Sequence, residues 1–321
     1  MNTKTPKKQP TILKPAPLHP GKAVAVISPA GPADENHLNA GVRELERWGY
    51  RVKVGEHTRG RIAYFSGSDQ ERLEDLLKAF SDPSVQAVFC SRGGYGSARL
   101  LEMIPYDFIA ENPRIFVGFS DLSALNWAFF ARARLVTFTG PLVTEIGEGL
   151  PDSTIRGFLN MIRPGRAPDT IWRGDWRAVR PGEASGPLFP GCLAIIVTLL
   201  GTPFLPDLEG AILLIEEIGE KPYQVDRMLT HLKNSGTLDQ IAGLLVGRMI
   251  NCWPKSRRGH HLSLEEILLD LTASNPIPIY TGLPYGHHLD RLTLPVGVNV
   301  EISEKEGLRL LEDPLARSNK A

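Results

Sequence analysis

Short apolar segments alternate with helical segments along the first half of the chain. The expected strands cover residues 23–28, 50–54, 85–90, 115–119 and 135–138, and the expected helices cover residues 36–48, 69–81 and 97–103. In the first two helical segments the apolar residues recur at the spacing of an amphipathic helix. Parallel strands need a crossover, usually a helix, so this alternation is typical of parallel sheets. We therefore expect a mostly parallel sheet flanked by helices.

The second half of the chain has a connecting segment and then a further series of elements. Residues 163–186 are rich in proline, glycine, arginine and tryptophan, which is typical of a connection between domains and is compatible with one strand. The elements expected beyond it are strands at 211–215, 241–246 and 298–302 and helices at 223–233 and 264–273. We expect a flexible lead-in over residues 1–20, an α/β domain over 21–165, a linker over 166–186 and a smaller mixed α/β domain over 187–321.

The composition excludes several classes of partner and cofactor. The 36 basic residues balance the 36 acidic residues, so neither nucleic acid nor a membrane is expected as a partner. None of the histidines belongs to a Cys-x-x-Cys or His-Glu-x-x-His motif, so neither a metal nor another cofactor is expected. Cys90, Cys192 and Cys252 are odd in number and widely spaced, as reduced thiols are. With no apolar run long enough to span a membrane, these cysteines favour a cytoplasmic protein.

Ser120 lies at the sharp turn between the expected strand 115–119 and a helix that runs to about Phe130. A serine at such a turn exposes its hydroxyl beside the free N–H groups of the helix N-terminus. Those N–H groups can stabilise the oxyanion that forms when a serine attacks a carbonyl. The alternative is structural, because Ser120 or Asp121 can simply cap the helix.

A glycine-rich loop, Ser91-Arg92-Gly93-Gly94-Tyr95-Gly96, follows the expected strand 85–90. Its glycines would let backbone N–H groups approach a ligand or an oxyanion. Gly94-x-Gly96 also begins the dinucleotide-binding pattern, but Arg99 stands where the third glycine is required. A glycine turn without a ligand is the remaining interpretation.

A carboxylate and a histidine in the second half could support a serine nucleophile. Glu216 and Glu217 follow the apolar strand 211–215, and a glutamate there can hold the tautomer of a histidine. His287 and His288 lie in a loop before the strand-like residues 292–296, and a loop histidine is the usual general base for a serine. The alternatives are a solvated strand end and idle, exposed histidines.

This order of serine, glutamate and histidine, with a glycine loop and no metal motif, resembles the LD-carboxypeptidases. These serine peptidases include the muramoyl-tetrapeptide carboxypeptidases. The resemblance extends from Gly21 to about Leu311. Its matching pieces include SPAGP (28–32), RGGYGSARLL (92–101), VGFSDLSAL (117–125), TGPL (139–142), LLGTPFLPDLEG (199–210), LLIEEIGEKPYQVDRML (213–229) and GLPYGHHLDRLTLPVG (282–297).

The resemblance implies a catalytic role for three side chains. The nucleophile of the family falls on Ser120, and its histidine falls on His287, which follows Gly286. Its glutamate falls on Glu216, which directly follows the apolar strand and precedes a second acidic residue. The backbone N–H groups of Asp121 and Gly94 would then form the oxyanion site.

The resemblance also implies the reaction and its setting. The family implies hydrolysis of the L,D amide bond that releases terminal D-alanine from peptidoglycan tetrapeptides during cell-wall recycling, often by a homodimer. Arg92 and Arg227 are candidates for binding the terminal carboxylate of the substrate. One departure from the family is Pro190-Gly191-Cys192, where Gly-Gly-Asn is common, and a substrate contact there is open to question.

Two alternative functions are compatible with the same sequence. The first is a serine peptidase like the microcin-C immunity proteins, which cleave an acyl-sulfamoyl aminoacyl nucleotide. The second is a non-catalytic α/β protein that binds a nucleotide or a sugar, with Ser120 as a helix cap and the histidines idle. The missing third glycine of the dinucleotide pattern disfavours the second.

Overall fold

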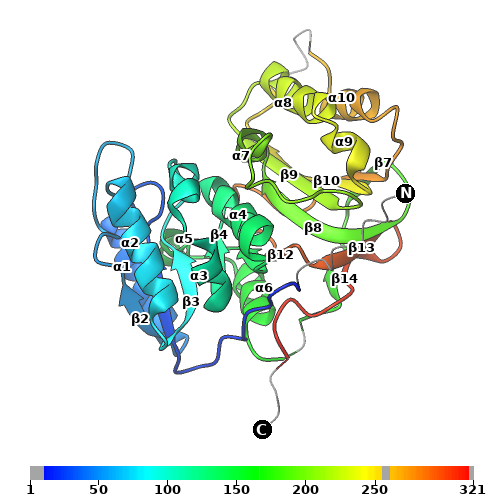
Figure 1. Cartoon of the computed structure of the whole chain (residues 1–321). Coiled ribbons are helices and arrows are strands. Elements are labelled where there is room, and N and C mark those ends of the chain that lie inside the picture. Colours follow the sequence, from blue (N-terminus) through cyan, green and yellow to red (C-terminus); the bar gives the residue numbers. More distant parts are fainter. Residues whose placement is uncertain (1–10, 166, 255–260, 318–321) are drawn as a thin grey trace, which may run out of the picture.

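The computed structural model describes residues 11–165, 167–254 and 261–317, which fold into two helix-covered β-sheets (Figure 1). The first sheet has the strand order β12-β5-β4-β3-β1-β2. Its strands are β1 (Ala23–Ile27), β2 (Arg51–Val54), β3 (Val85–Cys90), β4 (Ile115–Gly118), β5 (Thr137–Thr139) and β12 (Leu294–Val296). All pairings in it are parallel except that of β12 with β5. The mostly parallel sheet expected from the sequence is confirmed.

The first sheet forms around strands β1 and β4, which are apolar along their whole length. Every residue of β1 and β4 is buried, as expected for parallel strands covered on both faces. Helices cover this sheet, and two of them begin at a capping side chain: Asp34 accepts a hydrogen bond from His37 N, and Ser68 accepts one from Glu71 N in a capping box. The covering helices are α1 (Glu35–Arg47), α2 (Asp69–Ser81), α3 (Tyr106–Glu111), α4 (Ser123–Ala133), α5 (Val143–Glu148) and α6 (Asp152–Ile162), with 3₁₀ turns η1 (Ser97–Met103) and η2 (Ser120–Leu122).

The second sheet is mixed, with the strand order β6-β14-β13-β8-β9-β10-β11-β7. Its central strands run parallel: β8 (Ala184–Cys192), β9 (Ile212–Ile218), β10 (Gly243–Ile250) and β11 (Ile279–Thr281). The flanking strands pair antiparallel: β6 (Thr170–Trp172), β7 (Arg177–Arg180), β13 (Asn299–Ser303) and β14 (Gly307–Leu310). In Figure 1, α7 (Leu193–Leu199), α8 (Pro222–Asn234), α9 (Thr237–Gln240) and α10 (Leu264–Leu271) lie on one face of this sheet.

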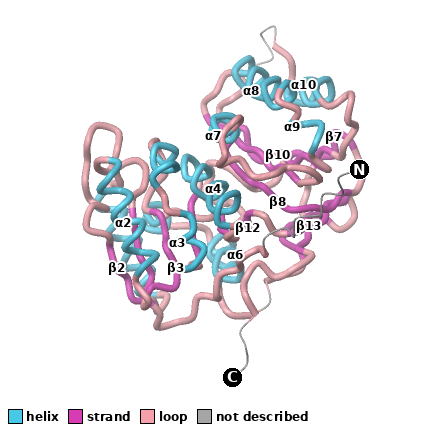
Figure 2. The backbone as a smooth tube through the Cα atoms, viewed as in Figure 1, coloured by secondary structure: helices cyan, strands magenta, loops and turns pink. Residues whose placement is uncertain are grey.

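Two connections tie the halves of the chain together. β6 and β7 come from the expected linker and pair at opposite edges of the second sheet. After β11 the chain crosses a long loop, drawn pink in Figure 2, and returns to the first sheet as β12. The loop between β11 and β12 is therefore anchored in both sheets.

The beginning of the described chain is bound to the first sheet. Leu13 N donates to the carbonyl of Arg134, and Val136 N donates to the carbonyl of Leu13, at 2.8 and 2.9 Å. Leu18 is fully buried and its N–H donates to the carbonyl of Ile162. Residues 11–20 of the expected lead-in are thus fixed by hydrogen bonds, whereas residues 1–10 lie outside the described chain. Within the described ranges no helix combines the length and apolar character that crossing a membrane requires.

Candidate active site

Ser120 occupies a strained turn between β4 and α4. Its φ is +63°, in the left-handed region, which costs about 1–2 kcal/mol for a residue with a side chain. Neither η2 nor α4 has a side-chain hydrogen bond at its N-cap. The helix-cap interpretation of Ser120 and Asp121 therefore has no support, and the strain points to another use of the hydroxyl.

The Ser120 hydroxyl belongs to a chain of hydrogen bonds that joins the two sheets. Ser120 Oγ lies 2.8 Å from His287 Nε2, and His287 Nδ1 lies 2.8 Å from Glu216 Oε2. Ser120 follows β4 of the first sheet, Glu216 lies on β9 of the second, and His287 lies in the loop between β11 and β12. The structure thus brings together three side chains that are far apart in the sequence.

The two neighbouring glutamates of β9 have different partners. Glu216 is fully buried and faces His287. Glu217 accepts hydrogen bonds from Ala194 N and Ile218 N and contacts the thiol of Cys192. Burial raises the pKa of the Glu217 carboxyl and also that of the Cys192 thiol. Successive residues of a strand face opposite sides, so only Glu216 can orient the histidine.

The glycine loop lies against the serine. A β-carbon on Gly93 would stand 3.0 Å from the Cβ and 3.3 Å from the Oγ of Ser120. Gly94 has a φ of +99°, and a β-carbon there would stand 3.2 Å from the Cα of Gly31. Gly31 N in turn donates to the carbonyl of Gly93 at 2.9 Å. The glycines are therefore required by close approach, and they bring loop backbone next to the hydroxyl.

Asp121 fastens this loop to the serine turn. Its Oδ2 accepts a hydrogen bond from Ser97 N at 2.9 Å, and its carbonyl accepts one from Ser97 Oγ at 2.7 Å. The side chain is buried, and that burial raises the pKa of the Asp121 carboxyl. The carboxylate is thus committed to the loop, and only the backbone N–H of Asp121 is a candidate for binding an oxyanion.

A cavity of about 450 Å³ opens beside Ser120 and His287. Gly93, Gly94 and Arg92 form part of its wall, and the rest comes from Phe119, Leu142, Thr144, Glu145, Glu148, His288 and Leu289. Arg92 donates to the carbonyl of Pro32 at 2.9 Å and is exposed. Arg227 is exposed on α8 and does not line this cavity. Of the two candidate arginines, Arg92 lines the cavity and Arg227 does not.

Arg291 supports the histidine loop, a role that the sequence analysis did not identify. It is buried and forms a two-pronged ion pair with Glu145, with one contact at 2.8 Å. It also donates to the carbonyls of Gly140 and His288. Its guanidinium lies 4.0 Å from the ring of Phe119, and that ring lies 4.8 Å from the ring of His287. The only sequence signal was an arginine inside the motif that carries the histidine.

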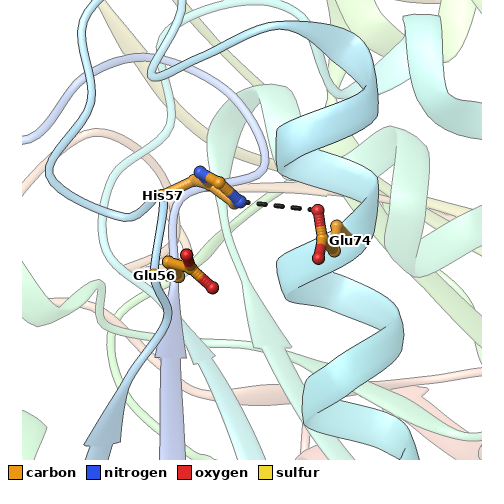
Figure 3. Close-up of side chains that lie close together, drawn as sticks. All are labelled: Glu56, His57 and Glu74. Atoms are coloured by element: carbon orange, nitrogen blue, oxygen red, sulfur yellow. Dashed lines mark ion pairs between the residues drawn. The ribbon is translucent and has the colours of Figure 1, made fainter.

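One cluster of side chains in the described chain has ligand types suited to a metal ion (Figure 3). Glu56, His57 and Glu74 offer ligand atoms within 4.8 Å of one another. The ammonium of Lys78 lies 3.0 Å from Glu56 and 2.8 Å from Glu74, and these bonds raise the pKa of Lys78. Because both carboxylates form ion pairs with Lys78 and the cluster does not line the cavity, we interpret it as a surface ion-pair network.

Two family models match the chain. The LD-carboxypeptidase N-terminal domain matches residues 24–140, and the LD-carboxypeptidase C-terminal domain matches residues 185–302. A relative from Bacillus subtilis (strain 168), named a probable murein peptide carboxypeptidase, is 36% identical over 301 residues, which cover 93% of this chain and 94% of the relative.

Two solved structures share the fold across most of the chain. The muramoyltetrapeptide carboxypeptidase from Oxalobacter formigenes has a TM-score of 0.77 at 30% identity, covering 89% of this chain and 96% of its own. The microcin C7 self-immunity protein MccF, in its wild-type apo state, has a TM-score of 0.86 at 25% identity, covering 95% of this chain and 100% of its own. These likenesses confirm the two-part α/β architecture.

Proposed function

The chain belongs to the LD-carboxypeptidase family, and on that premise we propose that it is a serine carboxypeptidase that releases the terminal D-alanine of peptidoglycan tetrapeptides. The observation that carries the proposal is the hydrogen-bonded series from Ser120 through His287 to Glu216, which opens onto a cavity. The names of the relatives, murein peptide carboxypeptidase and muramoyltetrapeptide carboxypeptidase, support the substrate.

The hydrogen bonds give each member of the series a role in the reaction. The Glu216 carboxylate accepts a hydrogen bond from the Nδ1–H group of His287, which leaves Nε2 free to accept the proton of Ser120. Ser120 Oγ then attacks the carbonyl of the third residue of the peptide, and His287 passes its proton to the leaving amine of D-alanine. Water hydrolyses the resulting ester, with His287 again acting as the base.

The negative charge that forms during attack needs hydrogen-bond donors beside Ser120. We assign the backbone N–H groups of Asp121 and Gly94 to this role, since each lies in a segment that contacts the serine. A single donor of this kind lowers the barrier by about 3 kcal/mol. Arg92 is our candidate for binding the terminal carboxylate, because it lines the cavity. Cell-wall recycling in the cytoplasm by a homodimer is the setting that we propose from the family resemblance.

The likeness to MccF favours a second candidate, a peptidase for an acyl-sulfamoyl nucleotide. Both activities would use the same serine, histidine and glutamate, so the substrate distinguishes them. We rank the tetrapeptide first because identity is 36% to the murein peptide carboxypeptidase and 25% to MccF.

The test is to incubate the purified protein with a muramoyl tetrapeptide and with aspartyl sulfamoyl adenosine, and to follow both by mass spectrometry. We expect loss of one alanine from the tetrapeptide and no loss from the same peptide ending in L-alanine. Ser120→Ala serves as the inactive control. Cleavage of the nucleotide analogue alone would reject the proposed function in favour of the second candidate.

A further inference from the structure

We propose that Glu148 forms a subsite for a cationic side chain on the residue whose carbonyl Ser120 attacks. The inference rests on the proposed function, because the attacked residue of a peptidoglycan tetrapeptide is a diamino acid with a free amino group on its side chain. The ligand class is therefore a primary ammonium group at the end of a flexible alkyl chain. Glu148 lines the same cavity as Ser120 and His287.

The cavity has two carboxylates, and the structure neutralises only one of them. Glu145 forms its two-pronged ion pair with buried Arg291 and also accepts a hydrogen bond from Leu142 N at 2.8 Å. Its charge is therefore compensated inside the protein. Glu148 lies one helical turn further along α5 and has no lysine or arginine in ion-pair contact among the described residues.

The one ion-pair contact of Glu148 in the described chain is with an imidazole. His37 Nδ1 lies 3.3 Å from Glu148 Oε1 and 3.7 Å from Asp34 Oδ1, so one half-exposed histidine is shared between two carboxylates. An imidazole carries charge only when it is protonated, and one positive charge cannot compensate both acids. The Glu148 side chain is 42% exposed and can therefore meet an incoming ligand.

Helix stability does not account for a glutamate at this position. Glu148 is the last residue of α5, and Gly149, with a φ of +98°, ends the helix. The carbonyl end of a helix favours cations and disfavours carboxylates. The charge is thus placed where it stabilises the fold least, at the rim of the reaction cavity.

The charges that line the cavity are complementary to those of the expected substrate. Arg92 provides one cation, suited to a terminal carboxylate, and Glu148 provides one uncompensated anion, suited to an ammonium group. A neutral side chain of the same length would fill the same space without the charge interaction. Selectivity for the charged form is therefore the measurable consequence.

The experiment compares two tetrapeptides that differ only at the third residue, one with L-lysine and the other with L-norleucine, which keeps the alkyl chain and lacks the ammonium group. We expect the wild-type protein to prefer the lysine peptide by about fivefold in kcat/KM, as a partly exposed ion pair allows. Glu148→Gln should bring the ratio close to one, and Glu148→Arg should invert it. Asp34→Asn is the matched control, since it removes a carboxylate beside His37 outside the cavity and keeps a good N-cap for α1. It should keep the wild-type ratio.

The following outcomes would contradict the proposal that Glu148 forms a subsite. If Glu148→Gln lowers kcat/KM equally on both peptides, Glu148 has a structural role. If kcat/KM stays at the wild-type value on both peptides, Glu148 does not contact the side chain. A change of ratio in Asp34→Asn as large as that in Glu148→Gln would assign the effect to long-range charge. Failure of the wild-type protein to release D-alanine from either peptide would reject the proposed function itself and the subsite with it.

Discussion

The serine turn and the histidine loop meet at one hydrogen bond but are held in place in different ways. The turn is short and lies between two regular elements, β4 and α4, with Asp121 fastening it to the glycine loop. The histidine loop is long and irregular, and side chains from the first half of the chain hold it. Arg291 binds Glu145, Tyr285 Oη lies 3.1 Å from Thr139 Oγ1, and Thr154 Oγ1 donates to the carbonyl of Leu289. Ser120 is therefore positioned by local backbone, and His287 by distant contacts.

The largest effect should follow removal of the hydroxyl. Ser120→Ala should lower kcat by about 10⁴-fold or more, because the remaining groups can bind substrate but cannot form the ester. Ser123→Ala is the matched control, since Ser123 belongs to the same motif but its Oγ accepts a hydrogen bond from Cys192 N. It should remain active. Release of D-alanine followed by mass spectrometry is the measurement, and near wild-type turnover by Ser120→Ala would remove the nucleophile assignment.

The next largest effect should follow a change at Glu216, the proposed partner of the histidine. Glu216→Gln should lower kcat by about 10²- to 10⁴-fold, because the amide no longer fixes the histidine tautomer. Glu217→Gln tests the neighbouring carboxylate, which binds backbone N–H groups and not the histidine. It should lower the thermal midpoint more than it lowers kcat. If the two variants lose kcat equally, the distinction between the two faces of β9 is wrong.

A change to the support of the histidine loop should have an intermediate effect. Arg291→Lys keeps a charge near Glu145 but loses the forked contact and the contact with the Phe119 ring, so His287 should shift relative to Ser120. We expect kcat to fall about tenfold to a hundredfold with little change in KM. A serine-directed phosphonate would count folded active sites, so that kcat is expressed per site.

Arg99→Lys is the control for this prediction. Arg99 is exposed, with its guanidinium 5.4 Å from the ring of Phe65 and an ion pair to Asp69, so its activity should stay within twofold of wild type. A kcat per site that stays at the wild-type value in Arg291→Lys would show that the loop is held without this arginine.

The smallest effect concerns the stability of the serine turn. Glycine accepts a φ of +63° without strain, so Ser120→Gly should be more stable than Ser120→Ala by about 1 kcal/mol. The same pair at Ser123, which lies in the regular helix α4, should show the opposite order by a similar amount. Urea denaturation of the four variants gives the free energies of unfolding. If the alanine variant is the more stable of the pair at Ser120 as well as at Ser123, the turn carries no backbone strain.

Much of the first sheet could be predicted because its information is local. The strand over 85–90 and the helix over 69–81 agree with β3 and α2 residue for residue. The helical segment 97–103 is a 3₁₀ turn, and α5 and α6 were not expected. The segment expected to be a linker contains β6 and β7, which are short and become strands only by pairing with β14 and β11. Such pairing depends on tertiary contacts that local patterns do not contain.

In the candidate site too, some features follow from the local sequence and others depend on tertiary contacts. The sharp turn at Ser120 could be predicted from the sequence around it. Glu216 was expected at a strand end, but β9 continues to Ile218, so it lies within the strand and is buried. The contacts of Arg291 join residues that are far apart in the chain, and no local pattern specifies them. Only the folded protein identifies Arg291 and Glu148 as parts of the site.

The antiparallel pairing of β12 with β5 limits how the polypeptide can be divided. β12 closes an edge of the first sheet, although it lies far beyond residue 165, where the first domain is expected to end. A polypeptide that stopped there would leave the N–H and C=O groups of β5 open, and open strand edges recruit other molecules. Expression of that part by itself should therefore give aggregates, and during synthesis the first sheet stays incomplete until residues 294–296 have left the ribosome.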